Sequence, residues 1–191
     1  MSNKQVKYTI DELDTWFFVD CEFDGHNGKL LSIAIAYGCE KPLYIVTGNS
    51  ANEPWVKEHV MPRLYKAPVD FVTTPELVGP PLLEYIKRFS CDMKPVIVAD
   101  SPVDIARLSQ AITTGYYGGW VPNQFQEMTF KVFNVDAYPT RLDQAIQHCA
   151  YWDALALRMK LYDLLEDAPT DGGEPAQHVH VRACVPAEVP G

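Results

Sequence analysis

The stretch FFVDCEFDG, residues 17–25, places two acids directly after a run of apolar residues. Side chains two residues apart on a β-strand point to the same face, so Asp20 and Glu22 would lie side by side. Burying a carboxylate without a partner costs several kcal/mol, and two neighbouring carboxylates also repel each other. The pair therefore indicates a site at which some partner compensates the negative charge.

The composition fits one globular domain. The chain has 191 residues, of which 47% are hydrophobic, and this is enough for one sizeable core.

Its five cysteines show no CxxC spacing, which disfavours a disulfide framework or a zinc knuckle and favours a reducing cytosol. No apolar run is long enough to span a membrane, and the N-terminal residues lack the apolar segment of a secretory signal. We therefore expect a cytoplasmic protein.

The formal net charge of −9 bears on nucleic-acid binding. Proteins that hold duplex DNA along its backbone usually carry a basic stripe, and this sequence has none, so a sequence-reading DNA binder is disfavoured. A nucleic-acid enzyme is still compatible with the acidic balance, because bound divalent cations reverse the local field where a phosphate sits.

The pattern along the chain predicts an α/β domain. Short apolar runs bounded by turn residues predict strands at 15–20, 30–37, 43–47, 95–99 and 129–135. Helical patterns fall at 52–66, at 75–89 with an interruption near Gly79, at 101–112, and at 141–166 in two pieces around His148. The first three strands have short links, as in an antiparallel meander. We expect a mixed five-stranded sheet flanked by helices within residues 1–167, and a disordered tail over 168–191.

Further acids and a histidine fall where such a sheet would bring them together. Asp104 lies in the first turn of the helix after the fourth strand, and Asp153 lies five residues after His148 on the last helix. Ligand sites in such sheets lie beyond the strand ends, so we expect these side chains to meet the acids of the first strand. Oxygen-rich sets without thiolates suit Mg²⁺ or Mn²⁺, and two such ions can clamp an in-line displacement at phosphorus. His148 could accept the proton of the attacking water, because imidazole titrates near neutrality.

Three motifs resemble those of the DEDDh exonuclease family. VDCEF (19–23) resembles the first motif, D-x-E, and ADSPVDIARL (99–108) resembles the second, in which an Asp opens a helix. HCAYWDAL (148–155) matches the third, H-x-x-x-x-D, and the order and spacing agree over residues 15–166. The compact size looks most like the small bacterial and phage exoribonucleases. One departure is Asp100, which stands where the family often has Asn and could either be a fifth acid near the metals or simply begin the loop.

The resemblance implies a ribonuclease H-like fold and a metal-dependent 3′–5′ exonuclease. It implies that Asp20, Glu22 and Asp153 ligate metal ions, that Asp104 helps to hold the second ion, and that His148 is the general base. Two divalent cations, Mg²⁺ or Mn²⁺, are the implied cofactors. The implied substrate is the 3′ end of single-stranded RNA, which would be shortened with release of nucleoside 5′-monophosphates. Family members often form dimers, although no motif for a homodimer is visible in this chain.

Three other readings stay open at this point. The substrate could be single-stranded DNA, or the domain could be a non-catalytic nucleic-acid-binding module with the same fold. The acids could also bind a structural Ca²⁺, although Ca²⁺ prefers larger cages rich in carbonyl oxygens. Asp104 has a structural alternative as well, because Ser101-x-x-Asp104 fits the capping-box pattern at a helix N-terminus.

Other side chains are candidates for contacting nucleic acid. Phe23 and Tyr116 could stack on the bases of a single strand, as aromatic residues do in many such proteins. Arg107 and Arg158 could each meet a phosphate, although solvated helix positions are the commoner role for arginine.

Overall fold

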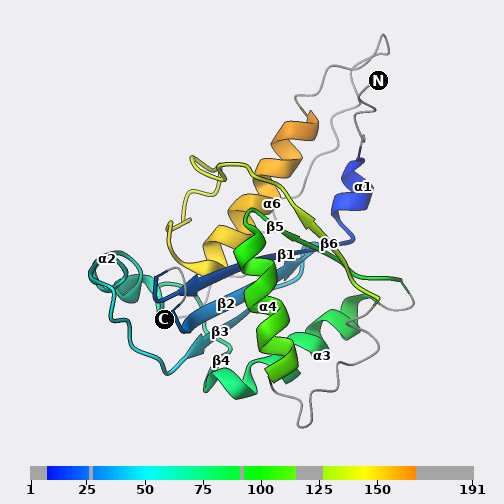
Figure 1. Cartoon of the computed structure of the whole chain (residues 1–191). Coiled ribbons are helices and arrows are strands. Elements are labelled where there is room, and N and C mark those ends of the chain that lie inside the picture. The colour runs from blue at the N-terminus through cyan, green and yellow to red at the C-terminus, as the bar shows by residue number, and fades with distance from the viewer. Residues whose placement is uncertain (1–7, 26–27, 91–92, 115–126, 167–191) are drawn as a thin grey trace, which may run out of the picture.

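The computed structural model describes residues 8–25, 28–90, 93–114 and 127–166, which form an α/β fold with a six-stranded mixed sheet flanked by helices (Figure 1). The strands are β1 (Trp16–Phe23), β2 (Leu30–Tyr37), β3 (Leu43–Thr47), β4 (Phe71–Thr73), β5 (Val96–Ala99) and β6 (Thr129–Val132). Their order across the sheet is β4-β3-β2-β1-β5-β6. β1, β2 and β3 form the expected antiparallel meander, whereas β4 and β5 pair in parallel with β3 and β1, and β6 in parallel with β5.

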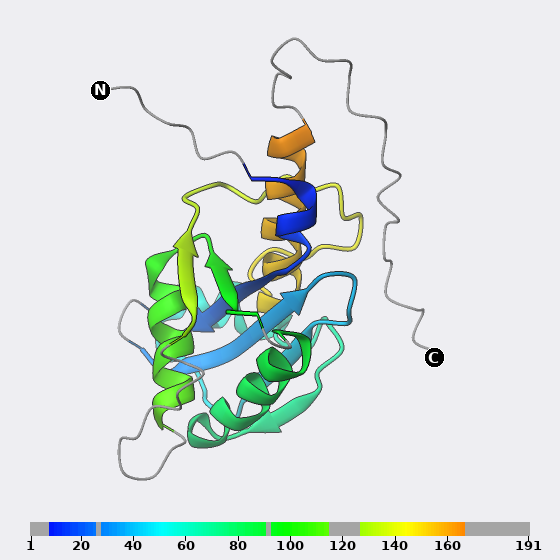
Figure 2. The same cartoon turned by 90° about the vertical axis from the view of Figure 1, so that its right-hand side faces the viewer.

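Helices cover both faces of the sheet (Figures 1 and 2). They are α1 (Ile10–Leu13), α2 (Pro54–His59), α3 (Gly79–Ser90), α4 (Pro102–Thr114) and α6 (Ala150–Glu166), with short 3-10 helices η1 (Met61–Arg63) and η2 (Pro75–Leu77). α6 packs on one face, and α3 and α4 pack on the other. The sheet therefore separates two apolar cores.

β1 determines which side its acids face. Its apolar side chains alternate, with Trp16 and Phe18 in the core under α6 and Phe17, Val19 and Cys21 in the core under α3 and α4. Because this alternation has a period of two, Asp20 and Glu22 continue the row that faces α6. The expectation that the two carboxylates share one face is thus consistent with the packing of the whole strand.

The predicted count of five strands is wrong, because the sheet has six. The additional strand, β4, has only three residues and is too short to show an alternating pattern. β1 is also longer than predicted and continues to Phe23, so that both Asp20 and Glu22 lie within the strand. β6 ends at Val132, short of residue 135, because its partner β5 ends at Ala99.

The helical prediction for residues 141–148 is wrong as well. α6 begins only at Ala150, and the segment before it forms bends and turns that include a cis Tyr138–Pro139 peptide bond. His148 has a φ of 64°, in the left-handed region, so it cannot continue a right-handed helix. The loop between β6 and α6 is thereby longer than the sequence suggested.

α3 and α4 approach each other closely at Gly79. A Cβ atom on this residue would lie 2.5 Å from the carbonyl oxygen of Ala111 and 3.1 Å from the Cα atom of Ile112. No side chain fits at those distances, so a glycine is needed at this position for the two helices to pack.

Three expectations remain, on membrane-spanning segments, on Tyr116 and on the C-terminal tail. Among the described residues, no helix is both long and apolar enough to cross a membrane. Tyr116 and the predicted tail over residues 168–191 lie outside the described ranges.

Candidate metal centre

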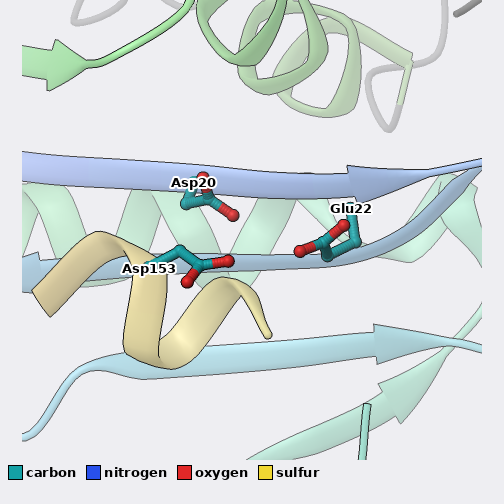
Figure 3. A group of neighbouring side chains, drawn as sticks. All are labelled: Asp20, Glu22 and Asp153. Carbon is teal, nitrogen blue, oxygen red and sulfur yellow. The ribbon is translucent and has the colours of Figure 1, made fainter. Parts of the chain in front are cut away.

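Three carboxylates converge between β1 and α6 (Figure 3). Asp20 and Glu22 extend from β1 toward Asp153, which lies in the first turn of α6. One carboxylate oxygen from each residue lies within 4.8 Å of one from each of the others. These three residues, here called the β1–α6 carboxylates, are close enough for one cation to contact all of them.

A second group of carboxylates shares Asp20. Oxygens of Asp20, Asp100 and Asp104 also lie within 4.8 Å of one another. Asp100 directly follows β5, and Asp104 lies in the first turn of α4, so this group joins two further elements to β1. We call it the β5–α4 carboxylates. The structure therefore brings Asp100, left open by the sequence, to the same place as the four predicted acids.

Burial makes these acids difficult to ionise together. Burial raises the pKa of Asp20, and the charges of Asp153 and Asp104 raise it further. The pKa of Glu22 is raised by burial, then by the charge of Asp153 and by a hydrogen bond with it. Burial also raises the pKa of Asp153 to about 6 and that of Asp104 to about 7. With a pKa of about 7, Asp104 is still partly protonated near neutrality, and a bound cation would favour the ionised form of all four acids.

The donor set itself fits a hard divalent cation. All five side chains offer carboxylate oxygens, which Mg²⁺ and Mn²⁺ prefer over thiolates. Cys21 stands between the two acids of β1 but lies on the opposite face, where its buried thiol donates to the backbone carbonyl of Asp104 at 3.8 Å. The sulfur of Cys21 is therefore turned away from the β1–α6 carboxylates.

The carboxylate of Asp153 is held by neighbours on both of its oxygens. The hydroxyl of Tyr138 donates to Oδ1 at 2.6 Å, and the backbone N–H of Cys149 donates to Oδ2 at 3.1 Å. Tyr138 could not be recognised from the sequence, because it lies in the loop between β6 and α6, where no periodic pattern points to it.

His148 stands at the turn into α6 and is half-buried. Burial lowers the pKa of its imidazole, and the positive charges of Arg63 and His59 lower it further. The ring is therefore neutral near pH 7, as a proton acceptor must be. It packs edge-to-face with Trp55, with ring centroids 5.0 Å apart, and it belongs to neither group of carboxylates.

The segment α2–η1 borders this site and was not predicted to contribute to it. The indole of Trp55 is 47% exposed and stacks on His59, with centroids 4.7 Å apart. Trp55 and Glu22 both line a hollow of about 480 Å³. Trp55, His59 and Arg63 are spaced by four residues, and this helical spacing is the signal that could have linked them.

Asp24 ties this segment to the end of β1. Its carboxylate accepts the backbone N–H groups of Asn52 at 2.8 Å and of Glu53 at 2.9 Å, just before α2 begins. Glu53 in turn caps α2 by accepting the N–H of Val56 at 2.8 Å. The hydrogen bonds of Asp24 and the Glu53 cap together keep Trp55 beside the strand that carries the acids.

The alternative role of Asp104 as a helix cap can be compared with its contacts. The hydroxyl of Ser101 accepts the N–H of Val103 at 3.1 Å, so the serine does cap α4. The carboxylate of Asp104 instead accepts the backbone N–H of Cys21 and faces Asp100. Its side chain, 4% exposed, thus points to the carboxylate groups and to β1.

The remaining candidates for contacting nucleic acid differ in their surroundings. Phe23 is half-buried, and the guanidinium carbon of Arg107 lies 5.0 Å from its ring centroid, at the edge of the site. Arg158 is buried, donates to the carbonyl of Gly38 and pairs with Asp14 at 3.5 Å, so its role is structural and it does not meet a phosphate.

Comparison with known proteins finds no family model that matches the chain and no curated protein similar to it. The function has to be inferred from the site itself.

Proposed function

We propose that the protein is a metal-dependent 3′–5′ exonuclease with a ribonuclease H-like fold, acting on the 3′ ends of single-stranded RNA and releasing nucleoside 5′-monophosphates. The observation that carries this proposal is the sharing of Asp20 by two groups of carboxylates, each within 4.8 Å. Two oxygen-rich groups that share an acid suit a pair of neighbouring divalent cations, which can clamp an in-line displacement at one phosphodiester.

The residues divide into two ligand sets. Asp20, Glu22 and Asp153 would hold one cation, and Asp20, Asp100 and Asp104 would hold the other. When bound, the two cations would lower the pKa of the attacking water and stabilise the charge on the leaving oxygen. The raised pKa values of Asp20 and Glu22 support this assignment, since a bound cation would supply the positive charge that these buried, mutually repelling carboxylates lack.

His148 would accept the proton of the attacking water. Its lowered pKa supports this role, because a neutral imidazole is available near pH 7. The positive charge of Arg63 lowers the pKa of both Glu22 and His148. A guanidinium near these two side chains is suited to bind a substrate phosphate.

The exposed ring of Trp55 supports a single-stranded substrate. Aromatic side chains stack on bases that are not engaged in a duplex, and Trp55 borders the hollow that Glu22 also lines. The preference for RNA over DNA rests on the resemblance of the three motifs to small exoribonucleases, so both sugars belong in the test.

The test uses an RNA and a DNA oligonucleotide, each labelled at its 5′ end and incubated with the protein and Mn²⁺. A ladder that descends from the full length, and that is lost in His148→Ala and in Asp153→Asn, supports the exonuclease. Replacing Mn²⁺ by Ca²⁺ should abolish the ladder. If the folded protein binds Mn²⁺ but shortens neither strand, the proposal is wrong, and binding without cleavage would identify a nucleic-acid-binding module.

A further inference from the structure

Tyr138 makes a direct hydrogen bond to one of the proposed ligands. Its hydroxyl donates to Oδ1 of Asp153 at 2.6 Å, a short distance typical of an O–H donor on a carboxylate. Tyr138 comes from the loop after β6, and Asp153 from α6, so the bond joins two segments that the metal ligands alone do not connect.

Tyr138 is itself held in place. Its backbone N–H donates to Oδ1 of Asp136 at 3.0 Å, in a turn at the start of the loop. Its half-buried ring packs against the core under α6. The packed ring therefore holds the hydroxyl in a fixed position beside Asp153.

Asp153 depends on this donor for its orientation. Its other oxygen accepts the N–H of Cys149 at 3.1 Å, so the two hydrogen bonds together set the rotation of the carboxylate. Without the Tyr138 hydroxyl, the backbone N–H groups of His148 and Cys149 and the carboxyl of Glu22 remain as partners of Asp153. Oδ1 then loses the donor that fixes its direction relative to Asp20 and Glu22.

We infer that Tyr138 is a positioning residue for Asp153 and sets the affinity of the β1–α6 carboxylates for their cation. This inference rests on the metal-binding part of the proposed function. Partners that orient a ligating side chain typically contribute about 10- to 100-fold to metal affinity. Because Tyr138 contacts Asp153 and not Asp100 or Asp104, its loss should weaken one of two cation sites.

The experiment compares Tyr138→Phe with Tyr162→Phe. Each change removes one phenolic oxygen that contacts an aspartate near α6, but the partner of Tyr162 is Asp14, which belongs to neither carboxylate group. Mn²⁺ binding is measured by isothermal titration calorimetry on the full chain, and Tm is measured without metal. We expect Tyr138→Phe to weaken one Mn²⁺ site about 10- to 100-fold, and Tyr162→Phe to leave both sites unchanged.

The outcomes separate this inference from the proposed function. Wild-type affinity in Tyr138→Phe overturns the inference, even if its Tm falls, because the tyrosine would then only stabilise the loop. A wild-type chain that binds no Mn²⁺ overturns both the inference and the proposed function. Weakened Mn²⁺ binding in Tyr138→Phe together with a wild-type chain that cleaves no nucleic acid supports the inference and overturns the nuclease.

Discussion

Asp20 and Asp153 bring carboxylate oxygens within 4.8 Å of each other, although β1 lies near the start of the described chain and α6 at its end. This contact depends on the register of β1. A shift by one residue against β2 would turn Asp20 to the face covered by α4, because side chains alternate along a strand. The site is therefore a property of the whole sheet and not of a local loop.

Asp20 should matter for both cations, and Glu22 for one. Asp20→Ala is expected to remove both Mn²⁺ sites, whereas Glu22→Gln should weaken one and leave the other. Loss of one cation removes several kcal/mol of transition-state stabilisation, so cleavage should fall by about 100-fold or more in each variant. Calorimetry and oligonucleotide cleavage measure the two effects, with circular dichroism as the control for folding. Near-wild-type cleavage by folded Asp20→Ala would contradict the assignment.

Without metal, stability should fall as the pH rises. Asp153 keeps its proton in the folded state up to about pH 6, and Asp104 up to about pH 7, whereas both lose it near their ordinary value of 3.8 when unfolded. The folded state then binds more protons than the unfolded state, so the free energy of unfolding decreases between these limits. Other carboxyls act in the opposite direction, as the lowered pKa of Asp24 does.

The comparison that isolates the effect is wild type against Asp153→Asn in EDTA. The stability of the variant relative to wild type should increase from about pH 4 to about pH 6 and then level off, and thermal unfolding measures it. Added Mn²⁺ should remove the loss in wild type and not in the variant. A constant difference in Tm across this range would show that Asp153 ionises normally.

Trp55 is expected to bind a nucleobase. Trp55→Ala should weaken the binding of single-stranded RNA by about 1–3 kcal/mol, the range for loss of one stacked base, while Trp55→Phe retains most of it. Fluorescence anisotropy with Ca²⁺ in place of Mn²⁺ measures binding without cleavage. Tyr65→Ala is the matched control, because this ring is also exposed, at 62%, but does not line the hollow beside Glu22. Equal losses in both variants would argue against a specific contact.

Arg158 should stabilise the fold and leave the chemistry unchanged. Arg158→Met removes charged hydrogen bonds to Gly38 and Asp14 and is expected to cost about 2 kcal/mol in the free energy of unfolding. Arg141→Met removes only exposed ion pairs and should cost much less. Urea unfolding measures both. A change in the cleavage rate per folded molecule of Arg158→Met would contradict this structural role.

Sequence patterns predicted those parts of the site that lie on regular elements. The period of two along β1 predicted that Asp20 and Glu22 share a face. The helix predicted after the fourth strand placed Asp104 in its first turn, where α4 has it. Tyr138 could not be predicted, because its position depends on how a loop folds over α6. β4 was missed for a related reason, since a three-residue strand has no period of its own and exists because β3 offers it an edge.

The contact at Gly79 places a limit on how this chain can diverge. Because any Cβ atom at this position would lie 2.5 Å from the carbonyl oxygen of Ala111, even alanine is not a conservative replacement here. A side chain at this position would separate two packed helices. In distant homologues, we therefore expect the glycine at the start of the helix before β5 to be retained more often than the surface residues around it.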